Sequence, residues 1–274
     1  MAAPAVNRTY RVQAPLSRFV EFLWYYRSDA PTDPKELVLP AGRADIIVGL
    51  RSDVMSIPVG AGGGGGTFAY GVVAGPHTRP FAIDTSRPSE VIGISFRPGG
   101  ALLLGVPAME LTDAHLAIDD IWHSRVAGLH EQLLAAGRVE ERLRLLEAEL
   151  IAQARGVPEP HPAVSFALRA FRGVPNPRTS DIAAQAGFST RRLIELFKEQ
   201  VGLTPKLYHR VRRFQRALPR IYGHKEVDWA EVASGVGYYD QAHFIHDFRR
   251  FSGLTPGEYL ARRGKHFNHV PLPA

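Results

Sequence analysis

The stretch ASGVGYYDQAHFIHDFRRFSGLTPGEY, residues 233–259, has a looser copy upstream at residues 183–208. Both copies end in Gly-Leu-Thr-Pro with a tyrosine three residues further on. They align at an offset of 50 residues up to Phe188 and at an offset of 51 from Leu193 onward. The second copy has therefore gained one residue between these points. We expect that residue to lie in an exposed turn, where insertions are tolerated.

Each copy has the pattern of a short helix, a tight turn and a longer amphipathic helix. Small Ala residues mark the first helix, Gly187 or Gly237 marks the turn, and apolar residues at helical spacing mark the second helix. Such a helix-turn-helix unit can place its second helix in the major groove of DNA. A single unit is more often an ordinary helical hairpin, but two copies joined by a basic segment favour DNA binding.

The positive charge of the chain is concentrated in the half that holds the repeat. The net charge of the whole chain is +6. Residues 1–157 carry 15 Lys and Arg against 17 Asp and Glu, a charge of −2, whereas residues 158–274 carry 18 against 10, a charge of +8. A basic second half is the electrostatic pattern expected of a domain that neutralises DNA phosphates.

Residues 161–263 resemble the paired helix-turn-helix DNA-binding domain of AraC/XylS-type transcriptional regulators. The resemblance covers a little over a third of the chain, and its residues are Ala233, Gly237, Tyr238, Phe244, Phe248, Gly253, Thr255, Pro256 and Tyr259. It implies an all-α C-terminal domain with two helix-turn-helix units, and a sequence-specific DNA-binding transcriptional regulator whose partner is double-stranded DNA. The family usually carries Arg or Lys where His246 stands, so we expect a weaker or pH-sensitive contact there.

The outward faces of the two second helices supply candidate residues for reading base edges. They are Thr190, Arg191, Ile194 and Glu195 in the first copy and Gln241, Ala242, Ile245 and His246 in the second. Arg191 can pair with guanine, Glu195 with cytosine and Gln241 with adenine, and each such contact contributes roughly 1–3 kcal/mol of discrimination. Candidate phosphate contacts, each of which could equally be a solvated charge, are Lys198, Lys206, Arg210, Arg212, Arg213, Arg249 and Arg250.

Residues 204–222 are expected to join the copies as one basic helix. At 1.5 Å per residue this helix would be about 28 Å long, close to the roughly 34 Å between successive major-groove faces on one side of a duplex. Pro219 should kink or end the helix near Leu218. The two units would then be angled differently from those of the family.

The first half of the chain predicts an α+β domain. Five short runs rich in Val, Ile and Phe between residues 37 and 98 indicate a small antiparallel sheet or barrel, and helical patterns follow from residue 100. A Pro-rich connector at residues 154–162 separates this domain, residues 1–157, from the DNA-binding domain, residues 158–274. Before the connector, Leu143, Leu146 and Leu150 form a stripe that packs either within the domain or against a second copy in a homodimer.

The segments GPHTRP at residues 75–80 and SFRPGGALLLGVP at residues 95–107 resemble parts of an N-terminal domain of unassigned function found in some AraC-like regulators. His77, Arg79 and Arg97 are weak candidates for contacts to a small-molecule effector, and the alternative is that they are surface loop residues. The hypothesis is a sensor and dimerisation domain. The competing hypotheses are a purely dimerising domain and a small β-barrel enzyme fused to a DNA-binding module. RNA polymerase would be a further partner of an activator.

Several features limit the other functions that this sequence could have. Because it contains no cysteine and no closely spaced histidine pair on an expected strand, we predict no catalytic residue, cofactor or metal site. It has no apolar run of membrane-spanning length and no signal-peptide core at its start, so we expect a cytoplasmic protein with no membrane partner. The glycine tract at residues 60–66 lacks the Lys-Ser/Thr of a phosphate-binding loop and is interpreted as a hairpin loop.

Overall fold

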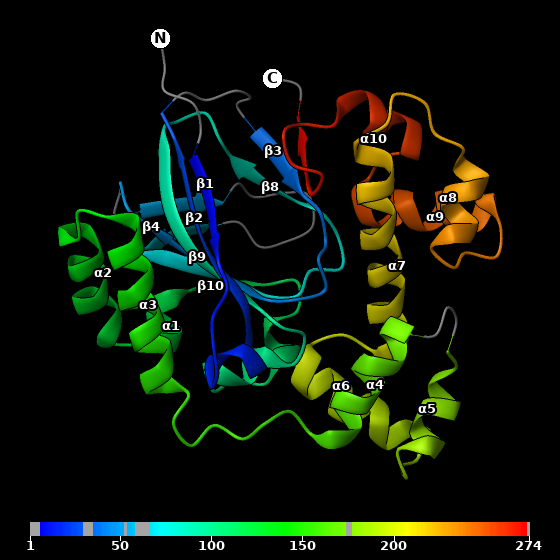
Figure 1. Ribbon diagram of the computed structural model, residues 1–274, viewed down its shortest axis with the longest axis horizontal. Coiled ribbons are helices and arrows are strands. Elements are labelled where there is room, and N and C mark those ends of the chain that lie inside the picture. Colours follow the sequence, from blue (N-terminus) through cyan, green and yellow to red (C-terminus); the bar gives the residue numbers. More distant parts are fainter. Residues whose placement is uncertain (1–5, 30–34, 52–53, 58–65, 174–176, 273–274) are drawn as a thin grey trace.

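The computed structural model describes residues 6–29, 35–51, 54–57, 66–173 and 177–272. Figure 1 shows the strands near the centre of the molecule, with one group of helices (α1 to α3) on one side and the C-terminal helices (α4 to α10) on the other. The predicted α+β first half and helical second half are both confirmed.

Six strands of the first half form one antiparallel sheet in the order β1-β2-β9-β4-β7-β10. Their bounds are Val6–Tyr10, Val20–Ser28, Ser89–Phe96, Asp45–Gly49, Gly71–Ala74 and His115–Ala117, in that order. Leu23, Ile94 and Ile46 are fully buried from three neighbouring strands and belong to one hydrophobic cluster. The described strands form an open sheet with β1 and β10 at its edges, so the sheet, rather than the barrel, is the arrangement adopted.

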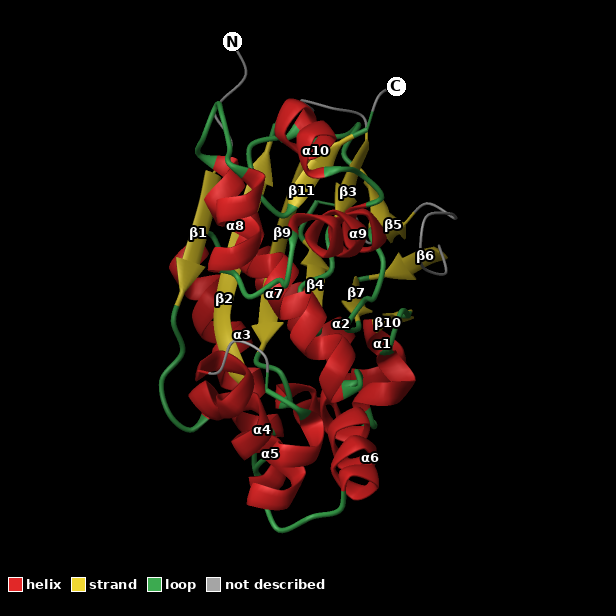
Figure 2. Cartoon of the chain, turned by 90° about the vertical axis from the view of Figure 1, so that its right-hand side faces the viewer, coloured by secondary structure: helices red, strands yellow, loops and turns green. Residues whose placement is uncertain are grey.

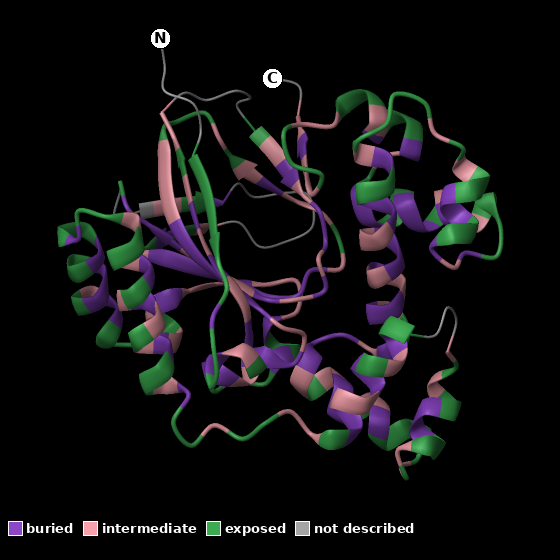
Figure 3. Cartoon of the chain, viewed as in Figure 1, coloured by how far each residue is buried: buried purple, intermediate pink, exposed green. Residues whose placement is uncertain are grey.

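The helices of the first half cover this sheet. They are the 3-10 helices η1 (Leu16–Arg18), η2 (Gly100–Leu104) and η3 (Ala108–Leu111) and the α-helices α1 (Ile118–Trp122), α2 (Arg125–Ala135) and α3 (Val139–Gln153). Leu143, Leu146 and Leu150 of α3 are buried in the same cluster as the strands. The leucine stripe is therefore part of the core of its own chain. In Figure 3 the central strands are mostly buried and the outward sides of α2 and α3 are exposed.

A second sheet of three strands contains residues from both ends of the chain. Its order is β11-β3-β8, with bounds His269–Pro271, Lys35–Val38 and Phe81–Asp84. His269 lies opposite Val38, and its ring Nδ1 is 2.9 Å from a carboxylate oxygen of Glu36. The end of the C-terminal half is thus paired with the first half. Two further strands, β5 (Val54–Ile57) and β6 (Gly66–Ala69), form a separate hairpin.

The second half consists of helices that repeat as the sequence predicts. They are α4 (Pro162–Gly173), α5 (Thr179–Gln185), α6 (Thr190–Val201), α7 (Pro205–Tyr222), α8 (Trp229–Gly235), α9 (Gln241–Ser252) and α10 (Pro256–Arg262). The pairs α5–α6 and α8–α9 are the two helix-turn-helix units. Gly187 and Gly237 have φ of +77° and +89° in their turns, a conformation that glycine adopts without strain. Figure 2 shows the two units near opposite ends of α7.

The prediction that α7 ends or kinks near Leu218 is wrong in its first part, because the helix continues through Pro219 to Tyr222. Proline removes one backbone donor and fixes φ near the helical value. Pro219 lies in the last turn of α7, so few backbone hydrogen bonds of the helix follow it. Leu218 and Ile221, on either side of it, are fully buried. Pro219 itself is exposed, and burial of Leu218 and Ile221 holds this turn in the helix.

The two halves share a hydrophobic core and specific polar contacts. Leu37 and Leu39 from the first half belong to the same buried cluster as the C-terminal helices. The side-chain amide of Gln215 on α7 donates to the carbonyl of Pro40 at 2.6 Å, and the Thr112 hydroxyl donates to the carbonyl of Gly202 at 2.6 Å. The end of α6 and the spacer helix α7 are therefore docked on the first half.

The glycine tract and the expected absence of a membrane-spanning segment remain to be compared with the structure. Residues 60–65 of the glycine tract lie outside the described residues, and Gly66 begins β6. Of the helices that are described, none is long and apolar enough to cross a membrane.

Candidate nucleic-acid interface

The second helices of the two units, α6 and α9, begin and end in the same way. At the start of α6 the Ser189 hydroxyl accepts a hydrogen bond from the backbone of Arg192 at 3.2 Å, and at the start of α9 the Asp240 carboxylate accepts one from the backbone of His243 at 2.7 Å. These caps satisfy donors that a helix start leaves unpaired. Both helices end at a glycine with positive φ. The sequence repeat is thus a repeat of local geometry.

The buried sides of α6 and α9 turn the candidate base-reading residues outward. Leu193 and Phe197 of α6 and Phe244 and Phe248 of α9 are fully buried. On the opposite sides, six of the eight candidates are exposed: Thr190, Arg191, Glu195, Gln241, Ala242 and His246. The remaining two, Ile194 and Ile245, are half-buried, and Ile245 packs against the core.

Two of the base-reading candidates on α6 contact each other. The Arg191 Nε lies 3.0 Å from a carboxylate oxygen of Glu195 one turn later, and Arg192 adds a second contact at 3.7 Å. The hydrogen bond from Arg191 lowers the pKa of Glu195. The Arg191 side chain remains 90% exposed. Exposed ion pairs of this kind are weak, so exchange of the Glu195 contact for a base edge costs little.

Two of the seven phosphate candidates, Arg210 and Arg213, make internal contacts between α7 and the second unit. Arg210 donates to the Asp247 carboxylate at 2.5 Å, and Arg213 lies 3.6 Å from the other oxygen. Arg213 also donates to the carbonyl of Gly237 at 3.1 Å and lies 4.4 Å from the ring centroid of Tyr238. Its side chain is 8% exposed. The structure therefore gives Arg213 a role in fixing the turn of the second unit.

Asp247, the buried partner of both arginines, is a residue that the sequence analysis did not identify. It is fully buried on α9, between Phe244 and Phe248 in the sequence. An acidic residue on the apolar stripe of an amphipathic helix needs a buried cation, because burial of an unpaired charge is costly. That position on the stripe was the available signal. The partners, Arg210 and Arg213, lie on another helix and could not be assigned from local pattern.

The other five phosphate candidates differ in their accessibility. Lys206, Arg249 and Arg250 are exposed, whereas Lys198 and Arg212 are half-buried. Lys206 lies in the first turn of α7, and the two arginines lie near the end of α9. The exposed cations among these five therefore lie at the start of the spacer helix and near the end of α9.

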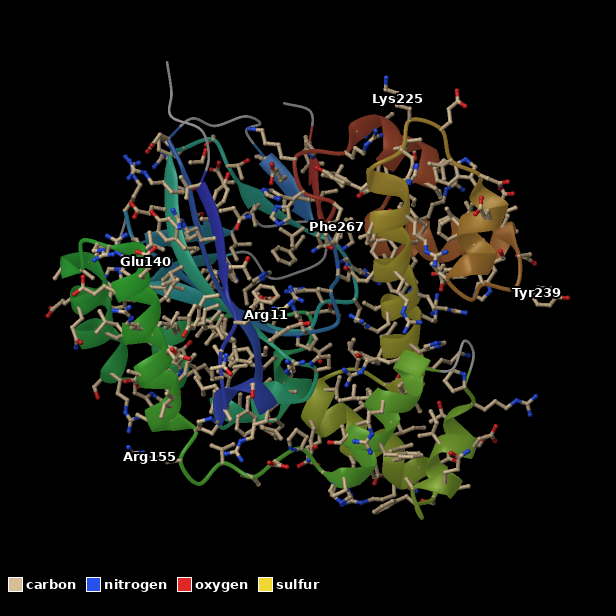
Figure 4. All side chains as sticks on the ribbon, in the orientation of Figure 1. Arg11, Glu140, Arg155, Lys225, Tyr239 and Phe267 are labelled. Atoms are coloured by element: carbon tan, nitrogen blue, oxygen red, sulfur yellow. The ribbon has the colours of Figure 1, made fainter. Side chains whose placement is uncertain are left out.

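The residue gained in the second copy is Tyr239. It lies between Tyr238, the counterpart of Phe188, and Asp240, which caps α9 as Ser189 caps α6. Tyr239 is 91% exposed, and Figure 4 shows it extending away from the second unit. The expectation that the extra residue lies in an exposed turn is confirmed.

The three weak ligand candidates of the first half are not brought together. His77 is 4% exposed, and its ring lies 4.4 Å from Phe81 and 4.6 Å from His115, centroid to centroid. Burial, together with the charge of His115, lowers the pKa of His77 to about 3. Arg79 is exposed, and Arg97 donates to the carbonyl of Ser17 at 2.7 Å. The described residues contain no group of three or more His, Asp or Glu that could hold a metal ion.

Comparison with protein-family models assigns two parts of the chain. Residues 182–262 match a helix-turn-helix domain, and residues 8–117 match a domain of unknown function, DUF6597. The first match spans both units described above. The comparison with curated proteins gave no match.

Some solved structures similar to this chain match little more than a third of it, and others match more than nine-tenths of it. An AraC-type transcriptional regulator from Chromobacterium violaceum is 27% identical over 38% of this chain and 94% of its own, with a TM-score of 0.33. The DNA-binding domain of AdpA, solved with a target DNA, is 23% identical over 38% and 98%, with a TM-score of 0.35. ToxT from Vibrio cholerae, solved with an unsaturated fatty acid, is 10% identical over 93% and 94%, with a TM-score of 0.46.

Proposed function

We propose that this chain, a DNA-binding transcriptional regulator whose residues 182–262 form a helix-turn-helix domain of the AraC type, inserts α6 and α9 into successive major grooves of one duplex. The two units lie near opposite ends of α7, whose 18 residues correspond to about 27 Å. Successive grooves on one face of B-DNA are about 34 Å apart. The difference is small enough for modest bending of the DNA to accommodate.

We propose that the exposed side chains of the two helices read base edges. Arg191 and Glu195 would exchange their mutual contact for guanine and cytosine, and Gln241 would pair with adenine. Lys206, Arg249 and Arg250 would contact phosphates and hold the protein in register. Because Arg213 is buried against Tyr238, it has no part in this phosphate set.

The first half, residues 1–157, would act on the DNA-binding half through the docking contacts. The Thr112–Gly202 hydrogen bond fixes the end of α6, and the β3–β11 pairing fixes the end of the chain. A small molecule that changes the first half would therefore shift the first unit relative to the second. We propose an effector-sensing role on this ground. A second copy of the chain and RNA polymerase are further proposed partners, and the proposal includes no enzymatic step.

The observation that carries the DNA-binding proposal is the pair of outward faces on α6 and α9, one near each end of a single helix. The test is selection of bound duplexes from random sequence by the full chain, followed by Arg191→Ala and Gln241→Ala. Each variant should lose discrimination at its own base pair, and the two positions should lie about one helical turn apart. Selection of one short motif, with no second position one turn away, would contradict the proposal.

A further inference from the structure

A recess of about 400 Å³ lies at the junction of the two helix-turn-helix units. The spacer helix α7 lines it with Lys206, His209, Arg210 and Arg213. The second recognition helix α9 lines it with His243, His246 and Asp247. Pro177, in the segment that leads into α5 of the first unit, closes a further side. Elements of both units and the helix between them therefore meet at this recess.

The recess has an excess of positive charge. Lys206, Arg210 and Arg213 carry a formal charge of +3 and Asp247, the acidic residue in the lining, carries −1, so their formal sum is +2. Asp247 is fully buried and is engaged by both arginines. Because Arg213 is buried against Tyr238, a ligand in the recess would meet Lys206 and Arg210 together with the imidazoles. An anion is the class of ligand that this lining fits.

Two of the side chains that line the recess are held in place, one by a lining residue and one by a residue behind it. Hydrogen bonds from Nε and Nη2 to both carboxylate oxygens of Asp247 fix the Arg210 guanidinium, whose side chain is 22% exposed. His209 is 7% exposed and stacks on Phe171 of α4, with ring centroids 5.3 Å apart. Cations that are preorganised and partly shielded from water attract an anion more strongly than mobile surface lysines do. The recess therefore has a structural basis for anion binding.

We propose that this recess is a phosphate site that takes a phosphodiester of the DNA backbone where the strand passes between the two major grooves. The inference rests on the proposed two-groove binding mode, because only a duplex that spans both units presents its backbone at their junction. It adds a defined phosphate position, with Lys206 and His246 as its exposed donors. The same chemistry would also admit a free phosphate group, which would then compete with DNA.

The test measures binding of the full chain to duplex DNA over a range of salt concentrations. Lys206→Gln removes one exposed cation from the recess, and His246→Gln removes one imidazole. The matched control is Lys225→Gln, an exposed lysine in the loop between α7 and α8 that Figure 4 shows at the edge of the molecule. If Lys206 faces a phosphate, the slope of log affinity against log salt becomes less steep by about 0.9 in Lys206→Gln. The control should keep the wild-type slope.

A second arm identifies the source of the phosphate. Inorganic phosphate replaces chloride at constant ionic strength while DNA binding is followed. Displacement of DNA beyond the chloride level in wild type and Lys225→Gln, but not in Lys206→Gln, would show that the recess also takes free phosphate. A reduced slope in Lys206→Gln without such displacement would assign the recess to the DNA backbone alone.

The result that overturns the inference is an unchanged slope in both Lys206→Gln and His246→Gln, or an equal change in Lys225→Gln. The proposed insertion of α6 and α9 into two grooves would survive that result, because wild type would still bind duplex DNA, but Lys206 would leave the set of proposed phosphate contacts. Failure of the wild-type chain to bind any duplex would instead contradict the proposed function itself. Thermal unfolding of each variant tests whether the substitution leaves the fold intact.

Discussion

The guanidinium of Arg210 on α7 donates to both carboxylate oxygens of Asp247 on α9, with Nη2–Oδ1 at 2.5 Å and Nε–Oδ2 at 3.3 Å. Asp247 is fully buried, and the Arg213 side chain beside it is 8% exposed. This group of charges ties the spacer helix to the second recognition helix. The orientation of α9 relative to α7 is therefore set by an ion-pair network as well as by the phenylalanine core.

We predict that Asp247→Ala destabilises the protein by about 3–5 kcal/mol, because removal of one partner leaves a buried cation without its counter-charge. The control is Glu195→Ala, which breaks the exposed pair with Arg191 and should cost far less stability, because exposed ion pairs are weak. Urea unfolding of both variants at pH 7 measures the difference. Equal costs for the two substitutions would show that the Asp247 network contributes no more than a surface ion pair.

Gly202 and Gly253 end the two recognition helices in the same left-handed conformation, with φ of +84° and +74°. Their surroundings differ. A Cβ on Gly202 would lie 2.5 Å from Pro76 Cγ and 2.7 Å from the carbonyl oxygen of Ala108, whereas nothing lies within 4 Å of one on Gly253. The first-half residues that approach Gly202 therefore make its environment specific to the docked arrangement.

We predict that Gly253→Ala costs about 1–2 kcal/mol, the usual penalty of the left-handed conformation, and that Gly202→Ala costs more. The excess arises because a methyl group at Gly202 must displace the first half from the end of α6. Urea unfolding gives the costs, and limited proteolysis of residues 154–162 reports loosening of the two halves. Identical stability and identical proteolysis of the two variants would contradict a tight contact at Gly202.

The local parts of this structure could be predicted from the sequence, and the long-range parts could not. Helical spacing, Gly187 and Gly237 specify α5–α6 and α8–α9 within short segments, so the repeat revealed both units. The strand β11 pairs with β3, which precedes it by more than 230 residues, and no local pattern indicates that partner.

In the candidate site, too, the local features could be predicted from the sequence and the long-range contacts could not. An outward position on a helix follows from periodicity, which placed Arg191 and Gln241 at the surface. The contacts of Arg213 with Tyr238 and Asp247 depend on how α7 crosses α9. In the sequence, only the charge of Arg213 was visible, and it suggested a phosphate contact. The expectation that α7 could end near Leu218 was wrong because burial of Leu218 and Ile221 outweighs the local preference of proline.

His77 gives the folded protein a defined response to acid. Its ring is buried against Phe81 and His115, its Nδ1 lies 3.8 Å from an Asp113 carboxylate oxygen, and its pKa is lowered to about 3, mainly by burial. In the unfolded chain the pKa would be about 6.5. The unfolded state therefore binds this proton first, and the stability contributed by neutral His77 is complete above pH 6.5 and lost as the pH falls toward 3.

We predict that wild type loses on the order of 1–2 kcal/mol more than His77→Leu when the pH of urea unfolding is lowered from 7 to 5. Leucine keeps an apolar side chain at this buried position and has no proton to bind. His224→Leu, at an exposed position between α7 and α8, is the matched control and should retain the wild-type response. The explanation fails if His77→Leu loses as much stability as wild type over the same pH interval.

His246 stands where the family that residues 161–263 resemble usually has Arg or Lys. Its exposed side chain lies on α9 and lines the recess beside Lys206 and Arg210. Two roles are open to it: a base edge in the groove or a backbone phosphate. His246→Arg adds a permanent positive charge with a planar donor array, so we predict tighter DNA binding. If the contact is to phosphate, affinity rises alike for selected and random duplexes, and the salt slope steepens by about 0.9. If it is to a base edge, the gain is confined to duplexes with guanine at one position, by roughly 1–3 kcal/mol.

His224→Arg makes the same chemical change outside the recess and separates a local contact from the general effect of added charge. The position of His246 favours the phosphate outcome, because its neighbours in the recess are cations on the spacer helix. Equal affinities for wild type and His246→Arg on both kinds of duplex would mean that α9 does not bring this residue to the DNA.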